Sequence, residues 1–220
     1  MESSLLALTV AAYLVAGFAW PVLRLWLHCG IWPVVFHREA APMQRGLGFL
    51  FVALFLGMLV LGVLHVAVGA NALGLWHPPA AARFGGWLLL ASGAVVTLVA
   101  QRHMGASWRV GIDDRPTDLV TTGLFRHVRN PIFAGMLAFV AGVVILSPAW
   151  WSIAIGILTA LGVRLQVAYE ERHLIALHDR AYLAYAARAG RFVPFVGRLR
   201  TAPRLRSARG SVAAIPEVKS

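Results

Sequence analysis

The sequence has little cysteine and little charge, and both shortages are informative. A single cysteine, Cys29, excludes an intrachain disulfide and any cysteine-rich metal site. Charged residues make up only 13% of the 220 residues, too few to cover the surface of a soluble domain of this size. The first residues carry no basic side chain before the first apolar run, so we expect no cleavable signal peptide.

Apolar residues are abundant instead. They make up 59% of the chain, which has a mean hydropathy of +0.72, and they form long runs. About 20 apolar residues cross a bilayer core. Five runs approach this length and predict an all-α integral membrane protein with five transmembrane helices. The runs cover residues 5–23, 47–70, 84–100, 131–147 and 150–168, and the fourth and fifth form a tight antiparallel hairpin.

Basic residues indicate how these helices cross the membrane. Of the 20 Arg and Lys residues, 19 lie after the first run, after the third run, or from Arg164 at the end of the fifth run onward, and only Arg83 lies elsewhere. Because basic loops remain in the cytoplasm, this distribution predicts an N-terminus outside. The net charge of +11 then suits the anionic lipids of the cytoplasmic leaflet better than nucleic acid, which we do not expect as a partner.

The chain divides into three parts in this interpretation. Residues 1–100 hold three spans, and residues 101–196 form a functional region with a long charged loop and the helical hairpin. Within that region, residues 169–189 have a polar and an apolar face, which predicts a helix on the membrane interface. Residues 197–220 are basic and rich in Ser, Ala and Pro, and predict a mobile tail that contacts anionic lipids.

A first group of polar residues precedes the fourth span. Gly123 permits a turn, and Pro131 suits the first turn of the following helix. Free N–H groups at a helix start, together with Arg129 and Asn130, are typical of an anion site. A basic cytoplasmic loop that ends in a helix cap explains the same residues without a ligand.

A second group, Glu170 and Glu171, lies at the end of the fifth span. Adjacent carboxylates beside a membrane helix are costly unless they are solvated or paired. Gln166 shares a helix face with Glu170, and Arg164 shares another with Glu171. The pair either accepts hydrogen bonds from a ligand or is a solvated helix end.

A third group combines Tyr-Leu-Ala-Tyr at residues 182–185 with Arg-Phe-Val-Pro at 191–194. Alone, it is typical of an interfacial helix followed by a proline stop. The eight histidines show no metal-ligand spacing apart from His173 and His178, which are five residues apart, so no metal site is expected.

The order of these groups resembles a known family. The series runs from Leu-Val-Thr-Thr-Gly-Leu-Phe at 119–125 through Arg-Asn-Pro-Ile-Phe at 129–133 and the two glutamates to the third group. This series resembles the isoprenylcysteine carboxyl methyltransferases and their relatives, the phospholipid N-methyltransferases, over about residues 102–196. The resemblance implies methyl transfer from S-adenosylmethionine to a lipid-like or otherwise apolar acceptor. It further implies an active site on the cytoplasmic face of the plasma (inner) membrane.

The resemblance also implies which residues bind the cofactor. The methionine carboxylate suits an arginine and helix-start N–H groups, and the ammonium or ribose hydroxyls suit a carboxylate. The implied cofactor-binding residues are Thr117, Asp118, Leu119, Val120, Phe125, Arg129, Asn130, Pro131, Ile132, Phe133 and Glu170.

Two departures from the family pattern bear on the acceptor. Asn130 and Phe133 stand where the family has His and Tyr, so neither position titrates. Gln166 stands where the carboxyl methyltransferases carry an Arg, with Arg164 the nearest basic residue, and both are predicted to contact the acceptor. Because a neutral amide suits a carboxylate poorly, a prenylcysteine acceptor is disfavoured.

An amine or hydroxyl acceptor must lose a proton during methyl transfer. Glu171 and His127 are the predicted catalytic residues, because either can accept that proton.

Two other classes stay open on the sequence alone. A sterol-type reductase shares related C-terminal motifs but binds NADPH, and the sequence contains no dinucleotide fingerprint. A non-catalytic scaffold or a small transporter is the other alternative. Transporters often place polar residues at mid-membrane, whereas only His65 lies there in this chain.

Overall fold

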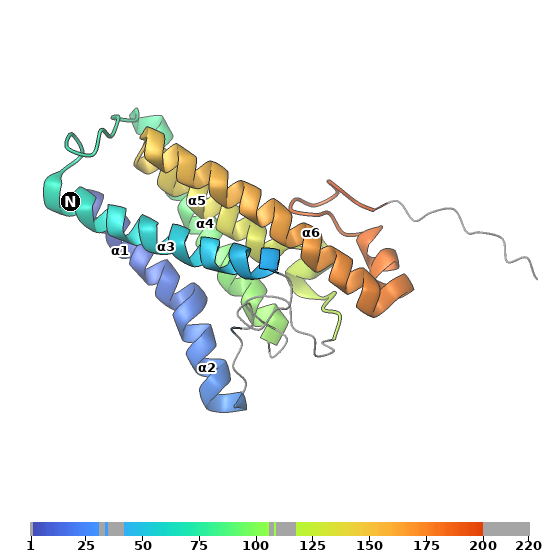
Figure 1. Cartoon of the computed structure of the whole chain (residues 1–220). Helices are drawn as coiled ribbons and strands as arrows, with labels where there is room; N and C mark the ends of the chain where they lie inside the picture. The colour runs from blue at the N-terminus through green and yellow to red at the C-terminus, as the bar shows by residue number, and fades with distance from the viewer. Residues whose placement is uncertain (1, 31–33, 35–41, 106–107, 109–117, 200–220) are drawn as a thin grey trace, which may run out of the picture.

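The computed structural model describes residues 2–30, 34, 42–105, 108 and 118–199. These residues form a bundle of helices, and they confirm the predicted all-α fold (Figure 1). The elements are α1 (Glu2–Leu14), the π-helix η1 (Val15–Ala19), α2 (Trp20–Cys29), α3 (Pro42–Val68), α4 (Ala80–Met104), the 3-10 helix η3 (Gly123–Arg126), α5 (Pro131–Leu146) and α6 (Trp150–Ala186).

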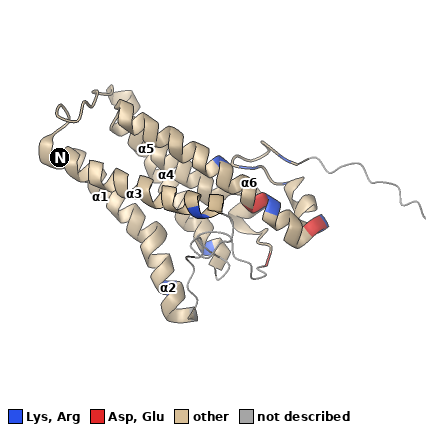
Figure 2. Ribbon diagram, viewed as in Figure 1, with Lys and Arg blue, Asp and Glu red and all other residues tan. Residues whose placement is uncertain are grey.

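The helices have the length and composition of membrane spans. Four segments are long and apolar enough to cross a bilayer, namely Glu2–His28, α3, α4 and α6. The shorter α5 is apolar along its whole length and pairs with α4 and α6. Each of the five predicted runs overlaps one of these segments, and the helices carry few charged residues (Figure 2). The orientation of the termini across the membrane stays a prediction.

Helices α4 and α5 pack with their backbones in contact. A Cβ atom added to Gly93 would lie 2.5 Å from the carbonyl oxygen of Gly135. One added to Gly142 would lie 2.6 Å from the carbonyl oxygen of Gly86. The glycines recur at the same spacing on both helices, so they meet in two pairs. Small residues of this kind let membrane helices approach closely.

Helix α1 docks on α4 through polar groups in the middle of the bundle. The Tyr13 hydroxyl lies 3.2 Å from Thr97 Oγ1, and its ring stacks on Phe139 at 3.8 Å. One turn further along α4, Gln101 Nε2 donates to the carbonyl oxygen of Gly17 at 2.5 Å. Gly17 lies inside η1, and π-helical turns break the regular hydrogen-bond ladder. Gln101 therefore supplies a donor to the irregular turn.

Replacing Gln101 by Leu is expected to lower stability by about 1 kcal/mol, because the Gly17 carbonyl loses its buried side-chain donor. Thermal unfolding of the purified protein in detergent measures this effect. Ser92→Ala is the matched control on the same helix, because the Ser92 hydroxyl is exposed and, among the described residues, bonds only to the carbonyl of Leu89. Equal midpoints for the Gln101 variant and the unaltered protein would show that this contact contributes nothing.

Helix α6 is longer than a membrane span. Its uninterrupted part, residues 150–178, extends over about 43 Å, whereas a bilayer core is about 30 Å thick. The interfacial helix predicted from residue 169 is the continuation of the fifth span, because no Gly or Pro lies between Gly162 and the helix end. The helix is interrupted only at Asp179, which has a positive φ of 41°. The C-terminal half of α6 therefore carries the glutamate pair beyond the apolar part.

Candidate active site

The segment before α5 is fastened to the end of α4. Gly123 has φ of 60°, and a Cβ atom there would collide with the ring of His103. The backbone N–H of Leu124 donates to His103 Nδ1 at 3.2 Å. The turn thus needs glycine both for its backbone conformation and for the close approach of the imidazole. This contact directs the following residues toward the end of α6.

The segments before α5 and after α6 then run side by side. Val128 and Gly190 form an isolated parallel bridge. The N–H of Arg129 donates to the Gly190 carbonyl at 2.8 Å, and that of Asn130 donates to the Arg191 carbonyl at 3.1 Å. In return, the N–H of Gly190 donates to the His127 carbonyl at 2.9 Å. This pairing brings Arg129, Asn130 and Arg191 to one place.

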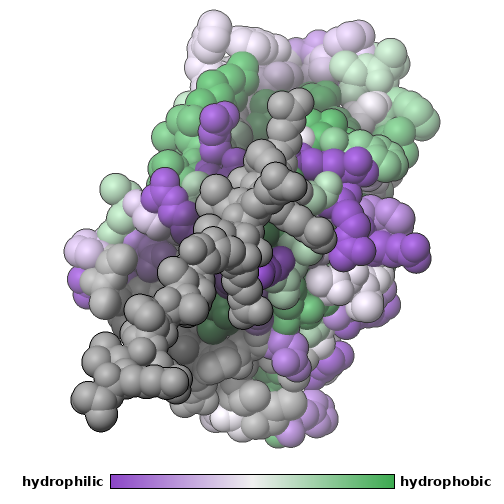
Figure 3. Space-filling view, turned by 90° about the vertical axis from the view of Figure 1, so that its right-hand side faces the viewer, coloured by the Kyte–Doolittle hydropathy of each residue, from purple (hydrophilic) through white to green (hydrophobic). Residues whose placement is uncertain are grey.

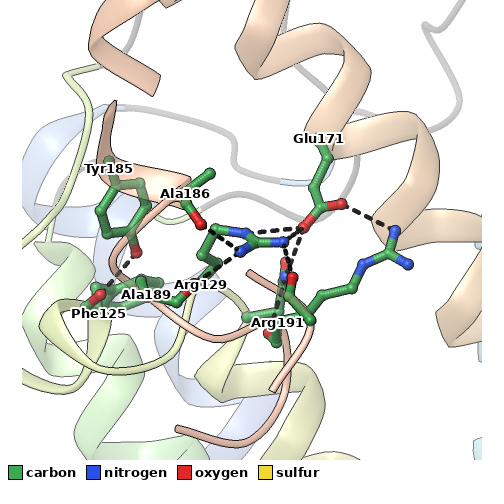
Figure 4. Close-up of polar contacts among 9 residues, drawn as sticks. Phe125, Arg129, Glu171, Tyr185, Ala186, Ala189 and Arg191 are labelled. Carbon is green, nitrogen blue, oxygen red and sulfur yellow. Dashed lines mark hydrogen bonds and ion pairs between the residues drawn. The ribbon is translucent and has the colours of Figure 1, made fainter. Parts of the chain in front are cut away.

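Arg129 lies at the centre of this arrangement and is 6% exposed (Figure 4). Its Nε and Nη2 donate to Glu171 Oε1 at 3.0 and 2.9 Å. The remaining N–H groups donate to the carbonyls of Ala186 at 3.1 Å, Ala189 at 2.8 Å and Gly197 at 3.1 Å. All five guanidinium N–H groups are therefore used within the chain. Arg129 joins α5, α6 and the segment after α6.

Glu171 is the acceptor that two arginines share. Its Oε1 receives Arg129, and its Oε2 lies 2.9 Å from Nη2 of Arg191. Asn130 Nδ2 donates to Oε1 at 3.4 Å and to the Arg191 carbonyl at 3.2 Å. A buried carboxylate is tolerated when it is paired and hydrogen-bonded in this way. We call Arg129, Asn130, Glu171 and Arg191 the Arg–Glu cluster.

The Arg–Glu cluster has an excess of positive charge. It contains two guanidinium groups and one carboxylate, and both ion pairs go to Glu171. The Arg191 side chain is 30% exposed, and its Nε is buried without a hydrogen-bond partner in the described structure. A buried donor without a partner is costly unless a ligand or a water molecule accepts its hydrogen bond. Arg191 is therefore suited to receive an anionic group.

The predicted site residues lie around this cluster to different degrees. Phe125 is buried, and its carbonyl accepts a hydrogen bond from the Tyr185 hydroxyl at 2.7 Å (Figure 4). Leu119 packs on the buried cluster that contains Tyr182 and Tyr185, whereas Phe133 packs on the cluster that joins α5 and α6. Pro131 and Gln166 are buried, Val120, Ile132 and Glu170 are half-buried, Asp118, His127 and Arg164 are exposed, and Thr117 lies outside the described residues.

Arg191 and Tyr185 are site residues that the sequence analysis did not select. Both belong to the third group of polar residues, which on its own suggests only an interfacial helix. Their place in the ordered series of motifs was the signal that could have identified them as site residues. Residues 197–199 differ from the prediction as well, because Gly197 binds Arg129 and the N–H of Leu199 donates to the Ala186 carbonyl at 3.0 Å. The rest of the predicted basic tail, from residue 200, lies outside the described residues.

The described residues thus form an integral membrane protein with a polar site at one end of an apolar bundle. Figure 3 shows the molecule from this end, where hydrophilic side chains gather. Residues 81–181 match the model of the phospholipid methyltransferase family, which confirms the resemblance and indicates a membrane methyltransferase. A search of curated proteins found no match. The matched range begins in α4 and contains Arg129, Glu170 and Glu171.

Proposed function

We propose that the protein transfers the methyl group of S-adenosylmethionine to a lipid-like acceptor, at the membrane face where the Arg–Glu cluster lies. The observation that carries this proposal is the convergence of the motif segments, distant in sequence, on one buried cluster, of which Arg129, Asn130 and Glu171 lie within the matched residues 81–181. By the distribution of basic residues this face is cytoplasmic.

The residues present suit the cofactor. Its methionine carboxylate fits Arg191, whose Nε lacks a partner, together with the N–H groups of Ile132 and Phe133 in the first turn of α5. The sequence suggested that Arg129 binds the cofactor, but its five donors already hold the chain together. We therefore assign Arg129 to positioning and Arg191 to the ligand.

Glu170 is the proposed partner for the hydroxyl or ammonium groups of the cofactor. It neighbours Glu171 on α6, yet both ion pairs of the cluster go to Glu171, which leaves the half-buried Glu170 carboxylate for a ligand. Phe133 and Phe192 pack beside Val163 and Val167 and offer an apolar surface nearby. The carboxylate and the apolar surface together match the polar and apolar parts of the cofactor.

The cofactor supplies an activated methyl group on a sulfonium, so the chain's own residues mainly orient the reactants and exclude water. Between the two predicted bases, we favour His127. It is exposed, whereas both oxygens of Glu171 are held by arginines. An amine or hydroxyl acceptor would give its proton to His127. Gln166 and Arg164 remain the proposed acceptor contacts, and the neutral Gln166 favours an acceptor without a carboxylate.

Replacing Glu170 by Gln is expected to weaken cofactor binding at least about tenfold, because a neutral amide accepts weaker hydrogen bonds than a carboxylate. Calorimetry in detergent with S-adenosylhomocysteine measures the affinity. Asp179→Asn is the matched control, since Asp179 is an exposed acid on the same helix and Asn tolerates its positive φ. Unchanged affinity of the Glu170 variant would refute the assignment, and binding of NADPH in place of S-adenosylhomocysteine would indicate a reductase.

A further inference from the structure

A cavity of about 260 Å³ lies at the opposite end of the bundle from the Arg–Glu cluster. Helix α5 begins beside the cluster at Pro131 and ends at Leu146, which lines this cavity. Its 16 residues separate the two places by about 24 Å. We call this space the distal cavity. Its polar and aromatic lining includes Glu2, His65, Trp76, His77, Arg83 and Trp87.

An ion pair lies in the wall of the distal cavity. Nη2 of Arg83 is 2.6 Å from Glu2 Oε2, and its Nε donates to Glu2 Oε1 at 3.0 Å. The indole N–H of Trp87 approaches the same oxygen at 3.4 Å. Both charged side chains are about half exposed, at 49% and 46%. An exposed pair of this kind stabilises a fold by only about 0–1 kcal/mol, so both charges stay available to a ligand.

A much smaller cavity adjoins the distal cavity. It shares Leu6 and His65 with it and has a volume of about 30 Å³, which is room for only one or two water molecules. Its walls come from α1, α3, α5 and α6 and include Val140. Beside the distal cavity, the apolar side chains of Leu5 and Phe84 are exposed. The charged mouth is thus bordered by apolar surface on the outside of the helices.

Tryptophans mark this end of the bundle as a membrane interface. Trp76 meets Trp150 edge to face at 5.1 Å, and the indole N–H of Trp151 donates to the Leu73 carbonyl at 2.9 Å. Trp87, which contacts Glu2, lies at the same end of the bundle. Tryptophan is enriched where lipid headgroups meet the hydrocarbon core. The Glu2–Arg83 pair therefore lies at the depth of headgroups.

We propose that the distal cavity binds a zwitterionic phospholipid. Arg83 would hold the phosphate, Glu2 would hold the ammonium, and the acyl chains would lie along the exposed apolar side chains beside the mouth, such as Leu5 and Phe84. The match of charges carries this choice. An anionic lipid would satisfy Arg83 and leave Glu2 facing a second negative charge, whereas a small soluble ion would leave the apolar surface beside the mouth unused. This site is separate from the proposed methyl-transfer site and does not depend on it.

Native mass spectrometry of the full chain, purified in detergent, tests the proposal. Phosphatidylethanolamine and phosphatidylglycerol with the same acyl chains serve as the probes. We expect one phosphatidylethanolamine molecule to be retained per chain, with about tenfold weaker retention of phosphatidylglycerol. Equal retention of the two lipids, or retention of neither, would overturn the proposal.

Two variants locate the lipid. Arg83→Gln is expected to lower phosphatidylethanolamine retention about tenfold, whereas Glu2→Gln is expected to abolish the preference over phosphatidylglycerol. Arg180→Gln, an exposed arginine on α6, is the matched control and should leave both lipids unchanged. Size-exclusion chromatography shows that each variant is folded. A folded Arg83 variant that retains phosphatidylethanolamine like the unaltered protein would contradict the assigned phosphate contact.

Discussion

Replacing Arg129 by Met is expected to destabilise the protein by about 3–5 kcal/mol, because it leaves the buried Glu171 with one arginine fewer and removes one hydrogen bond from each of three backbone carbonyls. The segment after α6 should then detach from α5. Thermal unfolding in detergent measures the loss, and limited proteolysis around Gly197 measures the detachment. Methyl transfer should be lost as well if the proposed function holds.

A matched control and a conservative variant sharpen this experiment. Arg126→Met removes an exposed arginine from the same segment and should leave the melting midpoint within error. Arg129→Lys keeps the charge but has only three donors, so an intermediate midpoint is expected. An Arg129→Met protein that melts like the unaltered one would show that the cluster is not what holds the segments together.

A Gly135→Val protein is expected not to accumulate in the folded state. An added Cβ atom would lie 2.5 Å from Thr97 Oγ1 and 2.7 Å from the Gly93 carbonyl oxygen, so α4 and α5 would have to separate. Overpacking ordinarily costs about 1–3 kcal/mol, and a backbone clash belongs at the upper end or beyond. The yield of monodisperse protein in size-exclusion chromatography measures the effect.

Gly57→Val is the matched control for this substitution. Gly57 lies within a membrane helix, α3, but a Cβ atom there would meet nothing within 4 Å. Its yield should equal that of the unaltered chain. If both variants accumulate equally well, the close approach of α4 and α5 is not required for folding.

The helices follow from the sequence because hydropathy alone requires them. A backbone in lipid must satisfy its hydrogen bonds internally, so an apolar run of sufficient length forms a helix. The predicted ends of the helices were less accurate where no Gly or Pro interrupts the sequence. The change to amphipathic composition at residue 169 suggested a new helix. No Gly or Pro ends the fifth span there, however, so the span and the predicted interfacial helix both belong to α6.

The site was predictable in its residue types but not in its connections. The ordered motifs selected Arg129 and Glu171, yet an arginine beside a helix start looks the same whether its donors face a ligand or the chain. Only the fold shows that the carbonyls of Ala186, Ala189 and Gly197 come within reach of Arg129. The glycine pairs of α4 and α5 escaped notice for a similar reason. Their meaning depends on which helices are neighbours.

The bridge between Val128 and Gly190 has a consequence for how an acceptor reaches the site. Helices α5 and α6 are joined at one end by residues 147–149 and at the other by the paired segments and Arg129. The two helices are thus connected at both ends. A lipid cannot pass between them unless one of these connections opens. The proposed apolar acceptor would therefore reach Gln166 and Arg164 along another flank of α6.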